Sequence, residues 1–143
     1  MLLGFKRRFA PYVEEGSKTH TIRATRKRPP RPGEICHCYV DPRQKTMRLL
    51  GRWPCVKVEE IEIDAPQEYH WTEVEVTIDG VRLDMDECNA LAWRDGFRNR
   101  GRDQAFAEMM DFWAGRLPFQ GHVIHWKWPE AIRKTVWKVS NER

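Results

Sequence analysis

The segment that decides the local structure is Val13-Glu14-Glu15-Gly16-Ser17-Lys18-Thr19-His20-Thr21-Ile22-Arg23. The apolar residues at helical spacing are Phe5, Phe9, Tyr12 and Val13, so we expect a short helix over Lys6 to Glu15. Gly16 is well placed to end that helix in a left-handed cap. Thr19 to Arg23 is rich in β-branched residues and is predicted to be a strand. A helix therefore passes almost directly into a strand, with Lys18 at the junction.

The rest of the chain alternates short strands with a few helices. Strands are predicted over Glu34–Val40, Met47–Trp53, Cys55–Ile63, Gly121–Trp128 and Thr135–Val139, with a hairpin over Glu73–Leu83 that turns at Asp79-Gly80. Helices are expected from Asp84 or Asp86 to Gly96, and from Asp103 to Ala114. A change of apolar parity predicts a bulge or bend near Glu59. This pattern favours an α+β fold in which helices flank a small β-barrel or strongly curved sheet. The length of 143 residues fits a single domain over 1–143.

Charge is unevenly distributed along the chain. Lys and Arg number 25 and Asp and Glu 21, a net charge of +4. Residues 1–52 hold 13 basic and 4 acidic residues, whereas residues 53–95 hold 3 and 12. The densest basic run, Arg23 to Pro32, contains prolines that favour an extended loop. It is a candidate surface for a polyanion, the alternative being a solvated loop whose charge offsets the acidic middle of the chain.

Cysteine usage and hydropathy bear on cofactors and compartment. Cys36-His37-Cys38 has the spacing of a strand and lacks the second ligand pair of a zinc site, so we expect buried thiols, no metal and no cofactor. No apolar stretch approaches the ~20 residues of a membrane span, and the N-terminus lacks the pattern of a signal peptide. A cytoplasmic protein with no membrane partner is expected, and we expect a monomer.

The segment from Gly16 to Arg23 resembles the signature of the ASCH family, in which a short helix precedes a strand of the form Gly-x-Lys-Thr-x-Thr-x-Arg. Three later segments are similar to family features in the same order: Pro32-Gly33-Glu34, Ala92 to Phe97, and Val123-Ile124-His125-Trp126. The similarity covers roughly residues 2–128 and leaves 129–143 as a C-terminal extension. It implies a PUA-like β-barrel and a role in RNA metabolism.

The resemblance also implies a catalytic set. Some ASCH proteins are amidohydrolases that remove the acetyl group of N4-acetylcytidine, and their lysine, threonine and helix-borne glutamate match Lys18, Thr21 and Asp95. The acid is therefore one methylene shorter than in the family. A lysine with a lowered pKa can act as a base, threonine can be the nucleophile, and the carboxylate can orient the lysine or pass protons. The alternative is a solvated lysine, a strand threonine and a helix-terminal aspartate.

Strand parity limits how these residues can meet. In an unbroken strand Lys18 and His20 point to one face and Thr21 to the other, so a shared pocket needs a bend between Gly16 and Thr19. His20, which titrates near neutrality, is predicted to bind ligand or transfer protons, and is alternatively a structural strand residue.

Further ligand contacts are expected from the basic loop and from aromatic residues. Arginine binds phosphate through two parallel donors, and aromatic rings stack on unpaired bases. The expected ligand-binding residues beyond His20 are Arg23, Arg26, Lys27, Arg28 and Tyr39. Tyr39 and Trp53 are the candidate stacking residues, and the alternative is that both belong to the core. The leading hypothesis is an ASCH-type protein that binds RNA or a modified nucleoside in a basic pocket. The alternatives are an amidohydrolase of the N4-acetylcytidine type or a single-stranded ribonuclease, and a protein-interaction module that uses the acidic segment 59–87.

Overall fold

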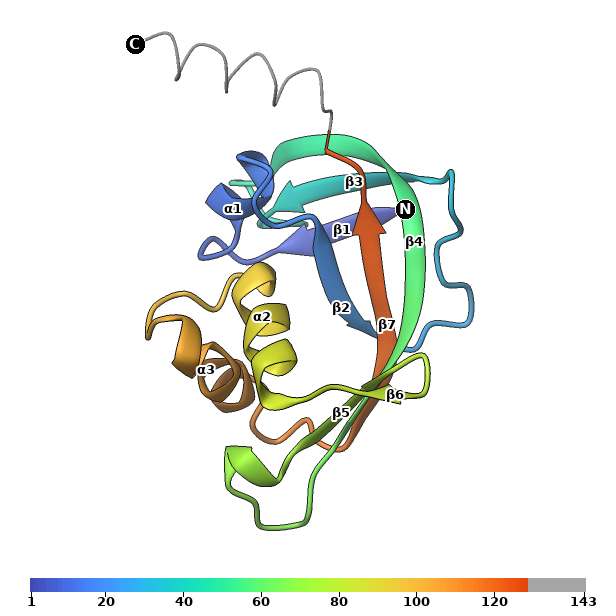
Figure 1. Ribbon diagram of the computed structural model, residues 1–143. Coiled ribbons are helices and arrows are strands. Elements are labelled where there is room, and N and C mark those ends of the chain that lie inside the picture. Colours follow the sequence, from blue (N-terminus) through green and yellow to red (C-terminus); the bar gives the residue numbers. More distant parts are fainter. Residues whose placement is uncertain (129–143) are drawn as a thin grey trace, which may run out of the picture.

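The computed structural model describes residues 1–128, which form a mixed α+β fold with one curved sheet and helices on one side of it (Figure 1). The sheet contains seven strands. In chain order the elements are β1 (Leu2–Phe5), α1 (Ala10–Glu14), β2 (His20–Ala24), β3 (Ile35–Val40), β4 (Arg48–Asp64), β5 (Glu75–Ile78), β6 (Val81–Arg82), α2 (Met85–Asp95), α3 (Ala105–Phe112) and β7 (Phe119–Trp126). Short 3-10 turns cover Trp71–Glu73 and Arg102–Gln104. The strand predicted over Thr135–Val139 lies outside the described residues.

The long strand β4 organises the sheet. Its first half pairs antiparallel with β3, which pairs in parallel with β1, and its second half pairs antiparallel with β5 and β7. Two strands were predicted here, but Pro54 lies inside one continuous strand. The register with β7 shifts between Cys55 and Lys57, so the irregularity predicted near Glu59 lies at Val56 instead. A bulge increases local twist, and β4 curves strongly in Figure 1.

The curvature brings two edges of the sheet toward each other without pairing them. Within residues 1–128, β2 pairs only with β7, and β1 only with β3. Among residues 1–128 no strand ladder joins β1 to β2, so the sheet is not closed into the predicted barrel. The two edges are bridged by a side chain, because Arg23 Nη2 donates a hydrogen bond to the carbonyl of Gly4 at 2.6 Å. Side chains, rather than a backbone ladder, therefore line the space between β1 and β2.

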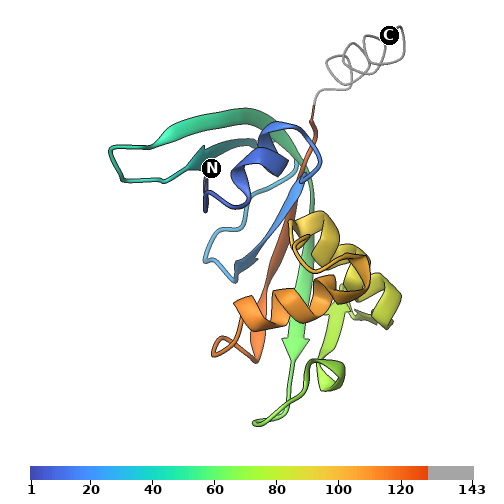
Figure 2. The same ribbon diagram turned by 90° about the vertical axis from the view of Figure 1, so that its left-hand side faces the viewer.

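Helices α2 and α3 lie together on one side of the sheet (Figures 1 and 2). Asp84 caps α2 as predicted, in a reciprocal capping box with Glu87, and Gly96 ends the helix with a φ of 109°. The hairpin between β5 and β6 turns at Asp79-Gly80, also as predicted, with positive φ at both residues. Local sequence thus places Asp95 at the last turn of α2.

The N-terminal segment differs from its prediction. The helix expected over Lys6 to Glu15 is limited to Ala10–Glu14, because Pro11 occupies a first-turn position that a helix tolerates only at its start. Leu2 to Phe5, for which no element was predicted, form β1, in which Leu3 and Phe5 are buried and Leu2 is exposed. A strand of four residues has too few alternations to be recognised, and its pairing with β3 is a long-range contact.

One hydrophobic core lies between the sheet and the helices and includes the four cysteines, Cys36, Cys38, Cys55 and Cys88. Within the described residues, no helix is long and apolar enough to cross a membrane.

Candidate functional site

Lys18 is a buried cation. Its residue exposure is 2%, and Nζ donates to Oδ1 of Asp95 at 2.5 Å. Gly16, with a φ of 83°, turns the chain after α1, and β2 begins only at His20. The strand parity that would separate Lys18 from Thr21 therefore does not apply, and the required bend is present. The interpretation of Lys18 as a solvated surface residue is wrong.

Asp95 is held by Lys18, which lies just before β2, and by His20, the first residue of β2, rather than by its own helix. A carboxylate in the last turn of a helix opposes the helix dipole, so local structure does not favour its charge. Burial by itself would raise the pKa of Asp95, but attraction to Lys18 and contact with His20 together outweigh burial and hold that pKa below its ordinary value of 3.8. Asp95 is therefore an ionised carboxylate at neutral pH.

Burial acts on the lysine in the opposite direction. It lowers the pKa of Lys18 from 10.5, as do the charges of Arg23 and Arg98, while Asp95 opposes the shift. The ammonium also lies 5.5 Å from the ring centroid of Phe9 and 5.9 Å from that of Phe5. A lysine whose proton is held less tightly than usual, beside a carboxylate, has the properties of a general base.

His20 lies behind this pair and does not line the pocket beside it. Its Nε2 is 3.2 Å from Oδ1 of Asp95, the oxygen that Lys18 also contacts, but it is not aligned for a hydrogen bond. Burial lowers the pKa of His20, so the ring is neutral at pH 7. His20 therefore contacts the carboxylate of Asp95 rather than the pocket, and its contact with a ligand stays a prediction.

A small pocket of about 190 Å³ opens between the edges of β1 and β2. We call it the inner pocket. Lys18, Thr21, Arg23 and Asp95 all line it, so the structure brings together the three residues predicted to be catalytic. Oγ1 of Thr21 accepts a hydrogen bond from Arg23 Nε at 3.0 Å, which leaves the hydroxyl hydrogen available to another partner. The remaining walls are largely aromatic: Phe5, Phe9, Phe97, Phe112 and Trp113.

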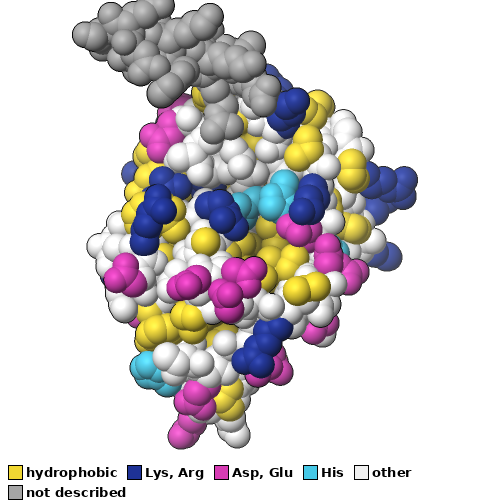
Figure 3. Space-filling model, in the orientation of Figure 1, with side chains coloured by type: hydrophobic (Ala, Val, Ile, Leu, Met, Phe, Trp, Pro, Cys, Tyr) yellow, Lys and Arg dark blue, Asp and Glu magenta, His cyan; other side chains and the backbone are white. Residues whose placement is uncertain are grey.

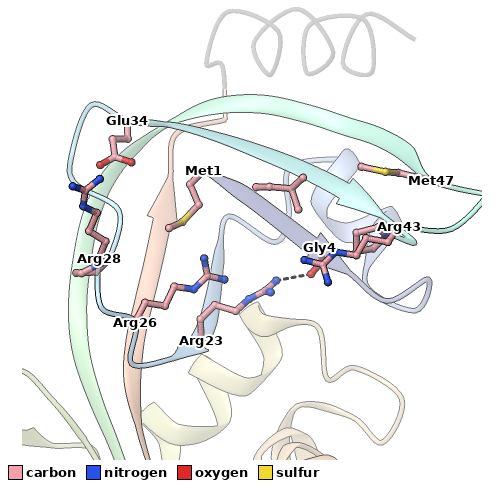
Figure 4. Close-up of a pocket in the computed structure, with 11 residues that line it drawn as sticks. Met1, Gly4, Arg23, Arg26, Arg28, Glu34, Arg43 and Met47 are labelled. Atoms are coloured by element: carbon pink, nitrogen blue, oxygen red, sulfur yellow. Dashed lines mark hydrogen bonds between the residues drawn. The ribbon is translucent and has the colours of Figure 1, made fainter.

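A larger cavity of about 860 Å³ adjoins the inner pocket, because Arg23 and Gly4 line both. We call it the arginine cleft. Figure 4 shows Arg28 and Glu34 at one end of it, Arg43 and Met47 at the other, and Arg23 and Arg26 between them. Within residues 1–128, Arg26, Arg28 and Arg43 form no ion pair, whereas Arg7, Arg8, Arg48, Arg82 and Arg100 each contact a carboxylate. Glu34 is the one carboxylate among the lining residues, so the four arginines leave the cleft with a net positive charge.

The basic loop predicted from the sequence forms one wall of this cleft. Arg26 and Arg28 are exposed on it, and Figure 3 shows Lys and Arg side chains gathered where the segment between β2 and β3 runs, at the right-hand edge. Lys27 and Tyr39 line neither cavity. Tyr39 alternates along β3 with the buried Cys38 and so lies on the outer face of that strand. Trp53 is a core residue that stacks on Trp126.

Several lining residues were missed from the sequence. Arg43 reaches the cleft from the loop between β3 and β4. Lys6, directly after β1, and Arg116, in the loop between α3 and β7, reach the inner pocket. No local motif marks them, because the chain segments that carry them become neighbours only through folding.

The thiols are poor candidates for chemistry. Burial raises the pKa of Cys36 to about 11, of Cys38 to about 12 and of Cys88 to about 11, so each stays protonated at neutral pH. The part of the chain that the structure describes holds no cluster of three or more His, Cys, Asp and Glu side chains suited to a metal ion.

No protein-family model, curated protein or solved structure matches this chain.

Proposed function

We propose that this is an ASCH-type protein with a PUA-like sheet that binds RNA or a modified nucleoside between β1 and β2. The observation that carries the proposal is the shared wall of the two cavities: a small aromatic pocket with a buried Lys18–Asp95 pair opens beside a cleft lined by four arginines. A nucleotide has two matching parts: an aromatic base, which suits the inner pocket, and a phosphate, which suits the arginine cleft.

The sizes of the cavities agree with this division. Small-molecule sites usually enclose ~300–1,000 Å³, so the inner pocket, at about 190 Å³, suits only part of a ligand. The aromatic walls offer ring contacts, and Lys18, Asp95 and Thr21 offer a donor, an acceptor and a hydroxyl. In the arginine cleft, the guanidinium groups can each bind phosphate through two donors. Exposed Leu2 and Met47 add apolar surface in the same cleft.

The test is binding of labelled single-stranded RNA measured at increasing salt. Phosphate contacts release counterions, so we expect the affinity to fall steeply with salt. Arg26→Gln with Arg28→Gln should weaken binding, whereas Arg52→Gln with Lys127→Gln, which removes the same charge outside both cavities, should have a much smaller effect. Undetectable binding at low salt would contradict the proposal.

A second candidate is a hydrolase, either an amidohydrolase of the N4-acetylcytidine type or a single-stranded ribonuclease. One observation favours it: Lys18, with a lowered pKa, lines the same pocket as Thr21 and Asp95. In the amidohydrolase, neutral Lys18 would accept the proton of Thr21 as the threonine oxygen attacks the acetyl carbonyl, and the C–N bond would break as the amine of cytidine leaves with that proton. Water would then hydrolyse the acetyl ester on Thr21, which releases acetate and restores the hydroxyl.

The hydrolase candidate is tested by incubation with N4-acetylcytidine and, separately, with labelled single-stranded RNA. Loss of the acetyl group or cleavage of the strand that disappears in both Lys18→Ala and Thr21→Val would establish an enzyme. If RNA binds but neither substrate turns over, the binding function alone remains.

The third hypothesis, a protein-interaction module that uses the acidic segment 59–87, stays a prediction. Two of its carboxylates have basic neighbours, since Glu59 contacts His125 and Lys57, and Glu75 contacts Arg82. A partner captured equally well by the native chain and by Lys18→Ala would support it.

A further inference from the structure

A second group of unpaired cations stands at the end of the inner pocket away from the arginine cleft. Along β1, Met1 and Leu2 line the cleft, Gly4 lines both cavities, and Phe5 and Lys6 line the inner pocket. The opposite wall has the reverse order, with Lys18 and Thr21 in the inner pocket, Arg23 shared, and Arg26 and Arg28 in the cleft. Lys6 therefore lies at the Lys18 end, with the base-sized pocket between it and the arginine cleft.

Arg116 joins Lys6 at this end. It comes from the loop between α3 and β7, and it lines the inner pocket but not the cleft. The Lys6 ammonium lies 4.8 Å from the ring centroid of Phe112, and the Arg116 guanidinium lies 6.0 Å from the same centroid. Phe112 is itself part of the pocket wall, so both cations lie near the same aromatic ring of that wall.

Neither cation is neutralised by the protein. Within residues 1–128, Lys6 and Arg116 form no ion pair, and both side chains are exposed. The neighbouring Arg8 provides the contrast, because it also lies over Phe112 but pairs with Glu108 at 2.5 Å. Its charge is compensated, whereas the charges of Lys6 and Arg116 remain available to an anion.

We propose that Lys6 and Arg116 form a second phosphate-binding site, so that the inner pocket takes a nucleotide from within a single RNA strand. One flanking phosphate lies at Lys6 and Arg116, and the other lies at Arg23 and the arginine cleft. This inference rests on the proposed RNA-binding function and specifies its ligand: an internal nucleotide rather than a free nucleoside or a chain end.

The experiment compares the salt dependence of RNA binding in matched double variants. Each phosphate contact on a single strand contributes about 0.7 to the slope of log K against log salt, so loss of two contacts should reduce the slope by about 1.4. We expect this reduction for Lys6→Gln with Arg116→Gln and a comparable one for Arg26→Gln with Arg28→Gln. Arg52→Gln with Lys127→Gln, outside both cavities, should leave the slope close to that of the native chain.

Three outcomes separate the proposals. If the slope of the Lys6/Arg116 variant equals the native slope while that of the Arg26/Arg28 variant falls, the second phosphate site is wrong and RNA binding through the cleft stands. If the control variant lowers the slope as much as the others, the effect is one of overall charge and the inference is again overturned. If the native chain binds no single-stranded RNA at low salt, the proposed function itself fails. All four substituted pocket residues are exposed, and circular dichroism spectra would verify that each variant is folded.

Discussion

Substitution Asp95→Asn tests whether the Lys18–Asp95 pair is as buried in solution as in the structure. The side chains of Lys18 and Asp95 are 3% and 9% exposed, and no other carboxylate within the described residues contacts Lys18. The variant would leave an ammonium in the protein interior without its counterion. Removal of one partner from a buried ion pair typically costs about 3–5 kcal/mol, a large part of the ~5–15 kcal/mol by which domains are stable.

The assay is urea unfolding at neutral pH, in which a change of midpoint at constant slope reports a change in the free energy of unfolding. Glu14→Gln is the matched control, because its pair with Arg48 is about half exposed on both sides. Exposed pairs contribute ~0–1 kcal/mol, so this control should lower stability only slightly.

A double-mutant cycle with Lys18→Met keeps the test informative even if a single variant folds poorly. The double variant contains neither charge, so it should be more stable than the sum of the single effects predicts. We expect a coupling energy in the upper part of the ~0.5–3 kcal/mol range found for contacting residues. A cost of Asp95→Asn within ~0.5 kcal/mol, or additive effects in the cycle, would refute the buried pair.

Three further predictions concern pH, backbone and thiols. The folded-state pKa of Asp95 lies below its ordinary value of 3.8, so its contribution to stability is present above pH 3.8 and is lost as the pH falls further. In Asp95→Asn the free energy of unfolding should therefore depend less steeply on pH below 3.8 than in the native protein. An unchanged pH dependence in this range would contradict the ionised state of Asp95. Gly16→Ala should destabilise the protein by more than ~1 kcal/mol in urea unfolding, because φ is 83° and the added Cβ would lie 2.5 Å from Trp128. Gly80→Ala is the control and should destabilise it less, because φ is similar, at 79°, but the space around Gly80 is open. Equal losses of stability would show that the contact with Trp128 is unimportant. A thiol reagent at mildly alkaline pH should modify Cys36, Cys38 and Cys88 only after unfolding, and rapid labelling of the native protein would contradict their burial.

Local chemistry made several features predictable. The cap of α2 follows from Asp84 and Gly96, and the turn of the β5–β6 hairpin from Asp79-Gly80, since each depends on residues close in the chain. The alternation that buries Cys36 and Cys38 in β3 was equally visible. The motif from Gly16 to Arg23 named Lys18, Thr21 and Arg23, all of which line the inner pocket.

Other features required the folded chain. β1 was missed because four residues carry too little periodicity, and β4 was divided in two because Pro54 usually interrupts a strand. The closed barrel was expected from the resemblance, yet the described strand ladders leave β1 and β2 unpaired. His20 was expected to contact ligand, but α2 places Asp95 beside it.

Residue order alone specifies the strand and helix propensities around Lys18 and the positive charge of the loop from Arg26 to Arg31. Folding is required to bury Lys18, to bring Asp95 to it from 77 residues away, and to place Lys6 and Arg116 in the same pocket. The physical reason is the range of the interactions involved. Caps, turns and alternation depend on neighbours within a few residues, whereas burial, ion pairing and cavity walls depend on contacts between segments that are remote in the chain.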